Sequence, residues 1–170
     1  MIKTLPIQID TREKRGHELL FPAHLTYRWR GRIQSVSVST ERLALTTGDY
    51  LCPGLPDLIG VERKGSLREL YTNFLTDDRD RARASFIRFA NAFETPVILA
   101  HVSYRDFRPN FRTGGLTLPG HLVWDAFTRL CSELDIHLWM CGPCRSIGDR
   151  RQLGTLVARM FLQRKLNDED

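Results

Sequence analysis

The segment from residue 48 to residue 64 reads GDYLCPGLPDLIGVERK and contains three charged residues in the pattern D-x12-E-x-K: Asp49, Glu62 and Lys64. Two carboxylates that converge on a divalent cation, with an ammonium beside them, are sufficient for hydrolysing a phosphodiester. The cation stabilises charge that develops on the phosphate oxygens, and the lysine holds or polarises the attacking water. The pattern alone is weak, because a chain with 20 acids and 25 lysines and arginines produces such spacings by chance.

The sequence around these three residues strengthens their interpretation as a site for phosphodiester hydrolysis. The run Asp57–Lys64 (DLIGVERK) predicts a strand, and the period of two places Glu62 and Lys64 on one face with Arg63 on the other. Gly48 marks a break, so Asp49 is expected at the edge of a strand or turn, where a hairpin-like approach would bring it to the face of Glu62. A further apolar run ends in an acid at Asp10, which could add a third carboxylate.

The remaining pattern predicts strands and helices in alternation. Period-two alternation and apolar runs predict strands, and a 3.6-residue apolar period predicts helices, one of them burying Phe86, Phe89, Ala90 and Phe93. A Gly- and Arg-bearing loop is expected over 103–118. These elements predict an α/β fold in a single domain, with one mixed β-sheet flanked by helices. The expected strands are 5–10, 33–38, 43–47, 57–64, 96–102 and 136–140, and the expected helices are 67–75, 79–93, 120–134 and 149–166.

Composition indicates a globular, basic protein. The chain has 170 residues, 42% of them hydrophobic, with a formal net charge of +5. No apolar run approaches the ~18 residues that a membrane span needs, and no signal-peptide segment is visible, so an intracellular protein without a membrane partner is expected. A positive excess suits a polyanionic partner such as DNA.

Three blocks together resemble a known family. Asp10-Thr11-Arg12-Glu13, Gly48-Asp49-Tyr50 and Val61-Glu62-Arg63-Lys64 resemble the nuclease domain of the XPF-type structure-specific endonucleases, a branch of the PD-(D/E)XK superfamily. The resemblance implies a restriction-endonuclease-like nuclease domain over residues 1–166. It leaves an acidic tail over 167–170, expected to be disordered, and no helix–hairpin–helix domain.

The resemblance also implies an activity and site roles. Asp49 and Glu62 would bind Mg²⁺ or Mn²⁺, Asp10 would complete the acidic cluster, Lys64 would position the water, and Arg63 would support the site or contact phosphate. The implied enzyme is a metal-dependent endonuclease that cleaves branched DNA such as flaps, forks or junctions. The family's first block also places Arg12 and Glu13 near the site, with less defined roles.

One departure from the family pattern leaves an alternative open. The family usually continues E-R-K-x3-D, but here Arg68 occupies the position of the acid and Glu69 follows it. Either Glu69 substitutes or the role is lost, so a catalytically weakened DNA-binding or scaffolding subunit is the alternative function. A nuclease of different purpose, such as a junction resolvase or a restriction-type enzyme, is also open.

Arginines interleaved with aromatic residues are candidate DNA contacts. Those near residue 30 could equally form an exposed hairpin arm, and the aromatic residues of the 103–118 loop could simply pack that loop down. In XPF-type nucleases the region of the last two helices contributes to dimerisation, so a homodimer or heterodimer through these helices is expected. The candidate DNA-binding residues are Arg12, Arg28, Arg30, Arg32, Arg83, Arg105, Arg108 and Arg112.

The segment Cys141-Gly142-Pro143-Cys144 suggests a further alternative, a thiol-disulfide oxidoreductase, because C-x-x-C at a helix N-terminus lowers a thiol pKa. Only one helix and a tail are expected after Cys144, which leaves no room for the later strands of a thioredoxin-like domain. The simpler interpretation is a turn with free thiols, and the scattered histidines do not suggest a zinc site.

Overall fold

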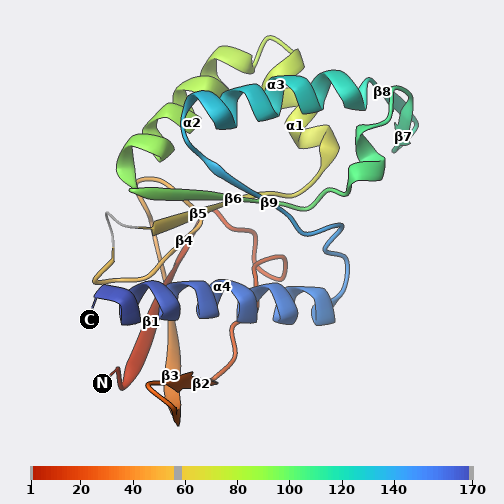
Figure 1. Ribbon diagram of the computed structural model, residues 1–170. Helices are drawn as coiled ribbons and strands as arrows, with labels where there is room; N and C mark the ends of the chain where they lie inside the picture. Colours follow the sequence, from red (N-terminus) through yellow and green to blue (C-terminus); the bar gives the residue numbers. More distant parts are fainter. Residues whose placement is uncertain (1, 56–58, 169–170) are drawn as a thin grey trace. The chain divides into compact units, whose positions relative to one another are not determined.

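A computed structural model describes residues 2–55 and 59–168 (Figure 1). The chain forms two compact units. Unit 1 consists of Met1–Ile59 and Arg145–Asp170, and unit 2 of Gly60–Cys144. Unit 1 holds Asp10 and Asp49, whereas unit 2 holds Glu62 and Lys64.

Unit 1 is a small mixed sheet with one long helix, α4 (Ile147–Asp168). Its strands lie in the order β2 (His24–Trp29), β3 (Arg32–Leu43), β1 (Thr4–Asp10) and β4 (Tyr50–Leu51). The pairs β2–β3 and β1–β4 are antiparallel, and β1 pairs in parallel with β3 over its whole length. Alternate β1 side chains, those of Leu5, Ile7 and Ile9, are buried. This alternation is what a strand with one covered face requires.

The turn between β2 and β3 is a tight two-residue turn. Arg30 and Gly31 both have positive φ, 46° and 78°. Positive φ at both central residues is the mark of the type I′ hairpin turn, whose twist matches that of the flanking strands. The arginines around the turn are therefore presented at the tip of a hairpin.

Unit 2 contains strands β5 (Ile59–Lys64), β6 (Thr95–Ala100) and β9 (His137–Met140) in that order, with β6 and β9 parallel. Helices α1 (Leu67–Leu75), α2 (Arg79–Ala92) and α3 (Gly120–Glu133) gather on one side of these strands (Figure 1). The ring of Phe74 lies 5.5 Å from that of Phe86 and 5.4 Å from that of Phe127, so aromatic contacts join the three helices. A 3₁₀ helix, η1 (Tyr104–Phe107), and a hairpin of β7 (Phe111–Thr113) and β8 (Leu116–Leu118) precede α3.

The expected α/β class, with mixed strand pairing and flanking helices, is confirmed. The separate strand expected over 43–47 is wrong, because β3 extends to Leu43 in register with β1 and no strand follows it before β4. The 103–118 segment is more ordered than expected, since it contains η1 and the β7–β8 hairpin. Phe86, Phe89 and Phe93 are buried as expected, whereas Ala90 is only half-buried.

The expected acidic tail, residues 167–170, overlaps the end of α4. Helix α4 includes Asn167 and Asp168, and residues 169–170 lie outside the described residues. Within the ranges 2–55 and 59–168, no helix is long and apolar enough to cross a membrane.

Candidate active site

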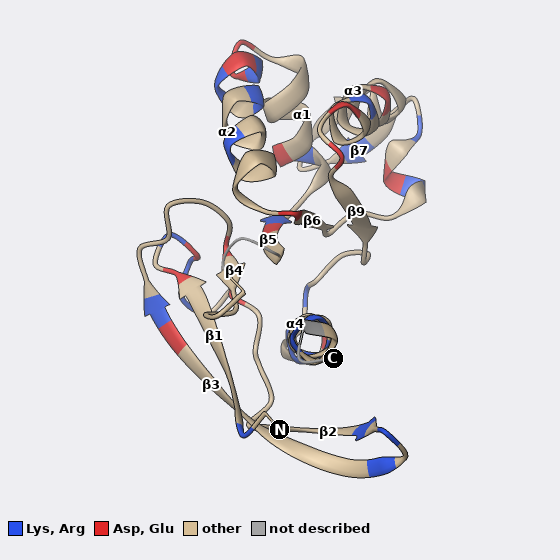
Figure 2. Ribbon diagram, turned by 60° about the vertical axis from the view of Figure 1, so that its left-hand side comes forward, with Lys and Arg blue, Asp and Glu red and all other residues tan. Residues whose placement is uncertain are grey.

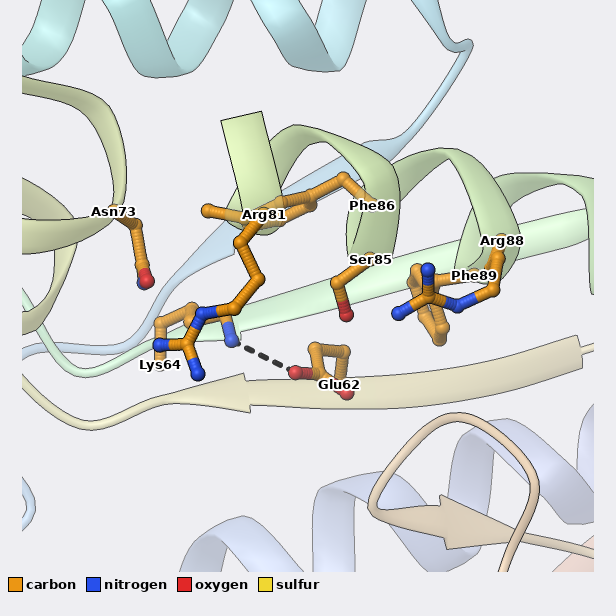
Figure 3. A pocket seen from close by; sticks show the side chains of 9 residues that line it. Glu62, Lys64, Asn73, Arg81, Ser85, Phe86, Arg88 and Phe89 are labelled. Carbon is orange, nitrogen blue, oxygen red and sulfur yellow. Dashed lines mark hydrogen bonds and ion pairs between the residues drawn. The ribbon is translucent and has the colours of Figure 1, made fainter. Parts of the chain in front are cut away.

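Glu62 and Lys64 line one wall of a cavity of about 240 Å³ in unit 2 (Figure 3). Strand β5 presents both side chains to the cavity, as the period of two predicts. Helix α2 forms the opposite wall, and Asn73 of α1 adds a polar group at one end. The lining consists of Glu62, Lys64, Asn73, Arg81, Ala82, Ser85, Phe86, Arg88 and Phe89.

The ammonium group of Lys64 is held in a defined position. Its Nζ donates to Glu62 Oε1 at 2.7 Å and lies 3.6 Å from Glu69 Oε1. It also lies 5.2 Å from the centre of the Phe86 ring, within the range of a cation–π contact. The Lys64 and Glu62 side chains are only 13% and 20% exposed. An ion pair so protected from water is stronger than one on an open surface.

Glu69, the residue after Arg68, lies next to Lys64. Its backbone N–H donates to the Ser66 side chain, which caps α1, and its own Oε2 accepts from the backbone of Gly65 at 2.8 Å. These two bonds resemble a capping box and fix the Glu69 carboxylate at the start of α1. From there it reaches Lys64, so an acid one position later than the family pattern still contacts the lysine. Arg68 itself is exposed.

The opposite face of β5 carries a different contact. Arg63 Nε donates to His101 Nε2 at 3.0 Å, and the backbone N–H of His101 donates to the Lys64 carbonyl. His101 is only 4% exposed. Burial, with a smaller contribution from the Arg63 charge, lowers the pKa of His101 to about 4. Sequence reasoning missed His101, although a single histidine next to the end of the apolar run PVILAHV was a visible signal.

Asp10 of unit 1 is fully buried and is bound by Arg12. The backbone N–H and the guanidinium of Arg12 donate to both carboxylate oxygens, and Arg12 Nη2 also reaches the Leu45 carbonyl at 3.1 Å. Burial on its own would raise the pKa of Asp10, but the hydrogen bonds and charge of Arg12 outweigh it and lower the pKa. The carboxylate proposed for the metal and the guanidinium proposed for DNA are thus joined to each other.

Asp49 follows Gly48, which adopts a φ of 78°, and precedes the fully buried Tyr50. Its carbonyl accepts from the Asp10 backbone N–H at 2.9 Å. The hydroxyl of Tyr50 donates to Glu13 Oε2 at 3.1 Å. Unit 1 therefore brings the first two sequence blocks together. The convergence of Asp49 with Glu62 stays a prediction.

The metal roles of Asp49, Glu62 and Asp10 also stay predictions. Among the described residues, no group of three or more His, Cys, Asp or Glu side chains is arranged to hold a metal ion. The donor chemistry of Asp49 and Glu62 nevertheless fits Mg²⁺ or Mn²⁺, because carboxylate oxygens are the hard ligands that these ions prefer.

The candidate DNA-binding arginines fall into separate places. Arg28, Arg30 and Arg32 are exposed around the β2–β3 turn of unit 1, whose tip carries positive charge in Figure 2. In unit 2, Arg108 and Arg112 line a second hollow with residues 109–111.

Two other arginines of unit 2 already have protein partners. Arg105 Nε donates to the Tyr104 hydroxyl at 3.1 Å. Arg83 binds Glu133 at 2.9 Å, so its guanidinium links α2 to α3. Its role as a DNA contact stays a prediction.

The cysteines lack the features of a redox site. Burial is the main cause that raises the pKa of Cys141 to about 11, and its Sγ donates to the Ala100 carbonyl at 3.2 Å. A reactive cysteine needs the opposite shift. All four cysteines are free thiols, and the raised pKa of Cys141 argues against the oxidoreductase alternative.

The fold is that of the XPF-type nucleases. The structure of XPF from Aeropyrum pernix is similar over 94% of this chain and 61% of that chain, with a TM-score of 0.58 and 19% identity. A structure of XPF from Aeropyrum pernix in complex with DNA gives a TM-score of 0.55 over 96% of this chain, again with 19% identity. The chain thus spans 61% and 66% of the lengths of those two chains. No protein-family model and no curated protein sequence matches the chain.

Proposed function

We propose that the protein is a metal-dependent endonuclease that hydrolyses phosphodiester bonds in branched DNA. The observation that carries the proposal is the cavity of unit 2, in which β5 presents Glu62 and Lys64 side by side opposite a basic helix. The XPF-type fold and the sequence blocks at Asp10 and Asp49 support it. The net charge of +5 also suits a DNA substrate.

As proposed, Glu62 and Asp49 would be the carboxylates that hold Mg²⁺ or Mn²⁺, and the ion would supply neutralisation of phosphate charge and a lower pKa for a water. Lys64 is the residue that positions the water or a phosphate oxygen. Its ammonium is shared with Glu62 at 2.7 Å, so a cation that engages Glu62 would leave Lys64 available to substrate. Asp10 could join only if Arg12 releases its carboxylate.

The contact between Glu69 and Lys64 favours a catalytic function over that of a scaffolding subunit. A carboxylate 3.6 Å from Lys64 Nζ keeps the ammonium in position even when Glu62 is engaged elsewhere. The alternative of a DNA-binding subunit without activity rests on Arg68, which stands where the family has an acid.

The test is a cleavage assay with end-labelled flap, fork, four-way junction and linear duplex DNA, with Mg²⁺, with Mn²⁺ and with EDTA. We expect metal-dependent cleavage of at least one branched substrate and little cleavage of the linear duplex. Asp49→Asn, Glu62→Gln and Lys64→Ala should each lower the cleavage rate by about 10²-fold or more, as loss of one charge-stabilising group does in other enzymes.

Matched controls are the exposed residues Lys3 and Glu41, changed to alanine and glutamine. Both control variants should cleave at the parent rate, and all variants should still bind the substrate. Binding of DNA by the parent protein without cleavage in either metal would support the scaffolding subunit. Parent-level cleavage by the Lys64 variant would exclude the proposed site.

A further inference from the structure

We infer that α2 carries a phosphate-binding site for the DNA strand next to the cleavage site, formed by Arg81, Ser85 and Arg88. The inference rests on the proposed function, because it uses the same cavity. It differs from the sequence-based expectation, which selected Arg83 from this helix. Figure 3 shows Arg81 and Ser85 reaching from α2 toward the strand that bears Glu62 and Lys64.

Helix geometry separates these residues from Arg83. At about 100° per residue, positions 81, 85 and 88 fall within roughly 60° of one another around the helix axis. Position 83 lies about 200° from position 81, on the other side of the helix. Its guanidinium accordingly binds Glu133 of α3, whereas Arg81, Ser85 and Arg88 line the cavity.

The charged lining of the cavity favours an anion beside Arg88. The lining holds three cations, Lys64, Arg81 and Arg88, and one carboxylate, Glu62. Lys64 is paired with Glu62 and Glu69 and Arg81 with Asp78, whereas Arg88 has no carboxylate partner among the described residues. A phosphate group supplies the charge and the acceptor oxygens that guanidinium groups bind in a fork geometry.

The two arginines are available for such a ligand. Arg88 forms no hydrogen bond or ion pair with any residue in the described part of the chain. Arg81 donates to Asp78 at 2.6 Å, but its side chain is 82% exposed, so this ion pair is weak and can be exchanged for a phosphate. Arg81, Ser85 and Arg88 are all exposed at the surface, which gives an extended polymer access.

The spacing favours a nucleic acid strand over a single small anion. Seven residues of α-helix rise about 10.5 Å. One strand of B-DNA advances about 3.4 Å per nucleotide along its axis, so for a strand that runs along α2 the two helix positions are roughly three nucleotides apart. Arg81 and Arg88 can therefore bind different phosphates of one strand, with Ser85 between them as a neutral donor.

The experiment measures DNA binding at several salt concentrations in EDTA, so that cleavage does not occur. The variants are Arg81→Ala, Arg88→Ala and the double variant, with Arg83→Ala as the matched control on the same helix. For duplex DNA, each lost phosphate contact should lower the slope of log K against log [salt] by about 0.9, and the double variant should lower it by about 1.8. Arg83→Ala should keep the parent slope.

A second measurement follows cleavage of the branched substrate in Mg²⁺. Arg88→Ala should raise KM more than it lowers kcat, and Arg88→Lys should recover part of the loss. Thermal unfolding of Arg88→Ala should match the parent, because the side chain makes no hydrogen bond or ion pair within the described residues.

Equal slopes for the Arg81, Arg88 and Arg83 variants would overturn the inference. That result leaves the proposed function intact if the parent still cleaves DNA. Absence of cleavage by the parent, with reduced slopes in the Arg81 and Arg88 variants, would instead overturn the proposed function and retain the phosphate site.

Discussion

The buried His101 should contribute to the pH dependence of the protein's stability, and His101→Gln should remove that contribution. His101 is 4% exposed, and its Nε2 accepts a hydrogen bond from Arg63. Protonation of the ring would place a charge in a buried site beside the Arg63 guanidinium and would convert the acceptor nitrogen into a donor. The folded state therefore favours the neutral imidazole, and burial is the main reason that its pKa falls to about 4.

The sign of the effect follows from proton binding in the two states. Between about pH 4 and 6.5 the unfolded chain binds a proton at this position and the folded chain does not, so stability rises with pH across this window. The contribution is complete above pH 6.5 and is lost as the pH falls toward 4. A shift of about 2.5 pKa units corresponds to roughly 3.4 kcal/mol, of which about 3 kcal/mol is lost between pH 7 and pH 4.

The assay is urea unfolding followed by circular dichroism at several pH values from 4 to 7.5. Glutamine retains an acceptor for Arg63 but does not titrate, so the His101→Gln variant should lose about 3 kcal/mol less than the parent over this range. His121→Gln, on the exposed surface of α3, controls for the loss of an imidazole. An unfolding free energy that falls equally in the parent and the His101 variant would refute this reasoning.

Two further outcomes are expected. Gly154→Ala should lower the unfolding free energy by about 1–3 kcal/mol, because a Cβ there would lie 2.3 Å from the Leu20 carbonyl oxygen. The control is Gly148→Ala in the same helix, where a Cβ meets only a side-chain oxygen at 3.4 Å. This control should be neutral or stabilising in thermal unfolding. In the Cys144→Ser variant, the reaction of Cys141 with iodoacetamide, measured by mass spectrometry, should be slow at pH 8 and accelerate toward pH 11. Fast reaction of Cys141 at pH 7 would contradict its raised pKa.

The geometry of β5 could be predicted from the sequence because it depends on local periodicity. Glu62 and Lys64 share one face and Arg63 the other simply because successive strand residues alternate. The contact of Arg63 with His101 joins residues 38 positions apart, and no local pattern contains that pairing. Such partners depend on strand order, which the alternation of apolar residues does not encode.

The arginines of α2 show a second limit. Sequence reasoning treated the segment as an arginine-rich helix and selected Arg83. The buried Phe86 and Phe89 set the phase of the helix, and that phase was available from the sequence. It could have shown that Arg81 and Arg88 flank the buried face. That Arg83 instead meets Glu133 depends on the packing of α2 beside α3, which only the structure provides.

The wrong prediction of a separate strand over 43–47 has a similar cause. Strand β3 pairs with both β1 and β2, and its length reflects this double pairing more than its own composition. Its last three residues, Glu41, Arg42 and Leu43, stay in register with β1 although two of them are charged. Tertiary pairing overrides local strand preference at such positions.

The order of the two units along the chain has a consequence for how the protein folds during synthesis. Unit 2 is one uninterrupted segment, whereas unit 1 is assembled from both sides of it, with α4 packing on β1, a strand translated more than 100 residues earlier. Unit 2 can therefore close as soon as its segment has left the ribosome. The apolar side chains of β1 that α4 covers must wait for that helix, so the nascent chain is most open to aggregation or chaperone capture during that interval.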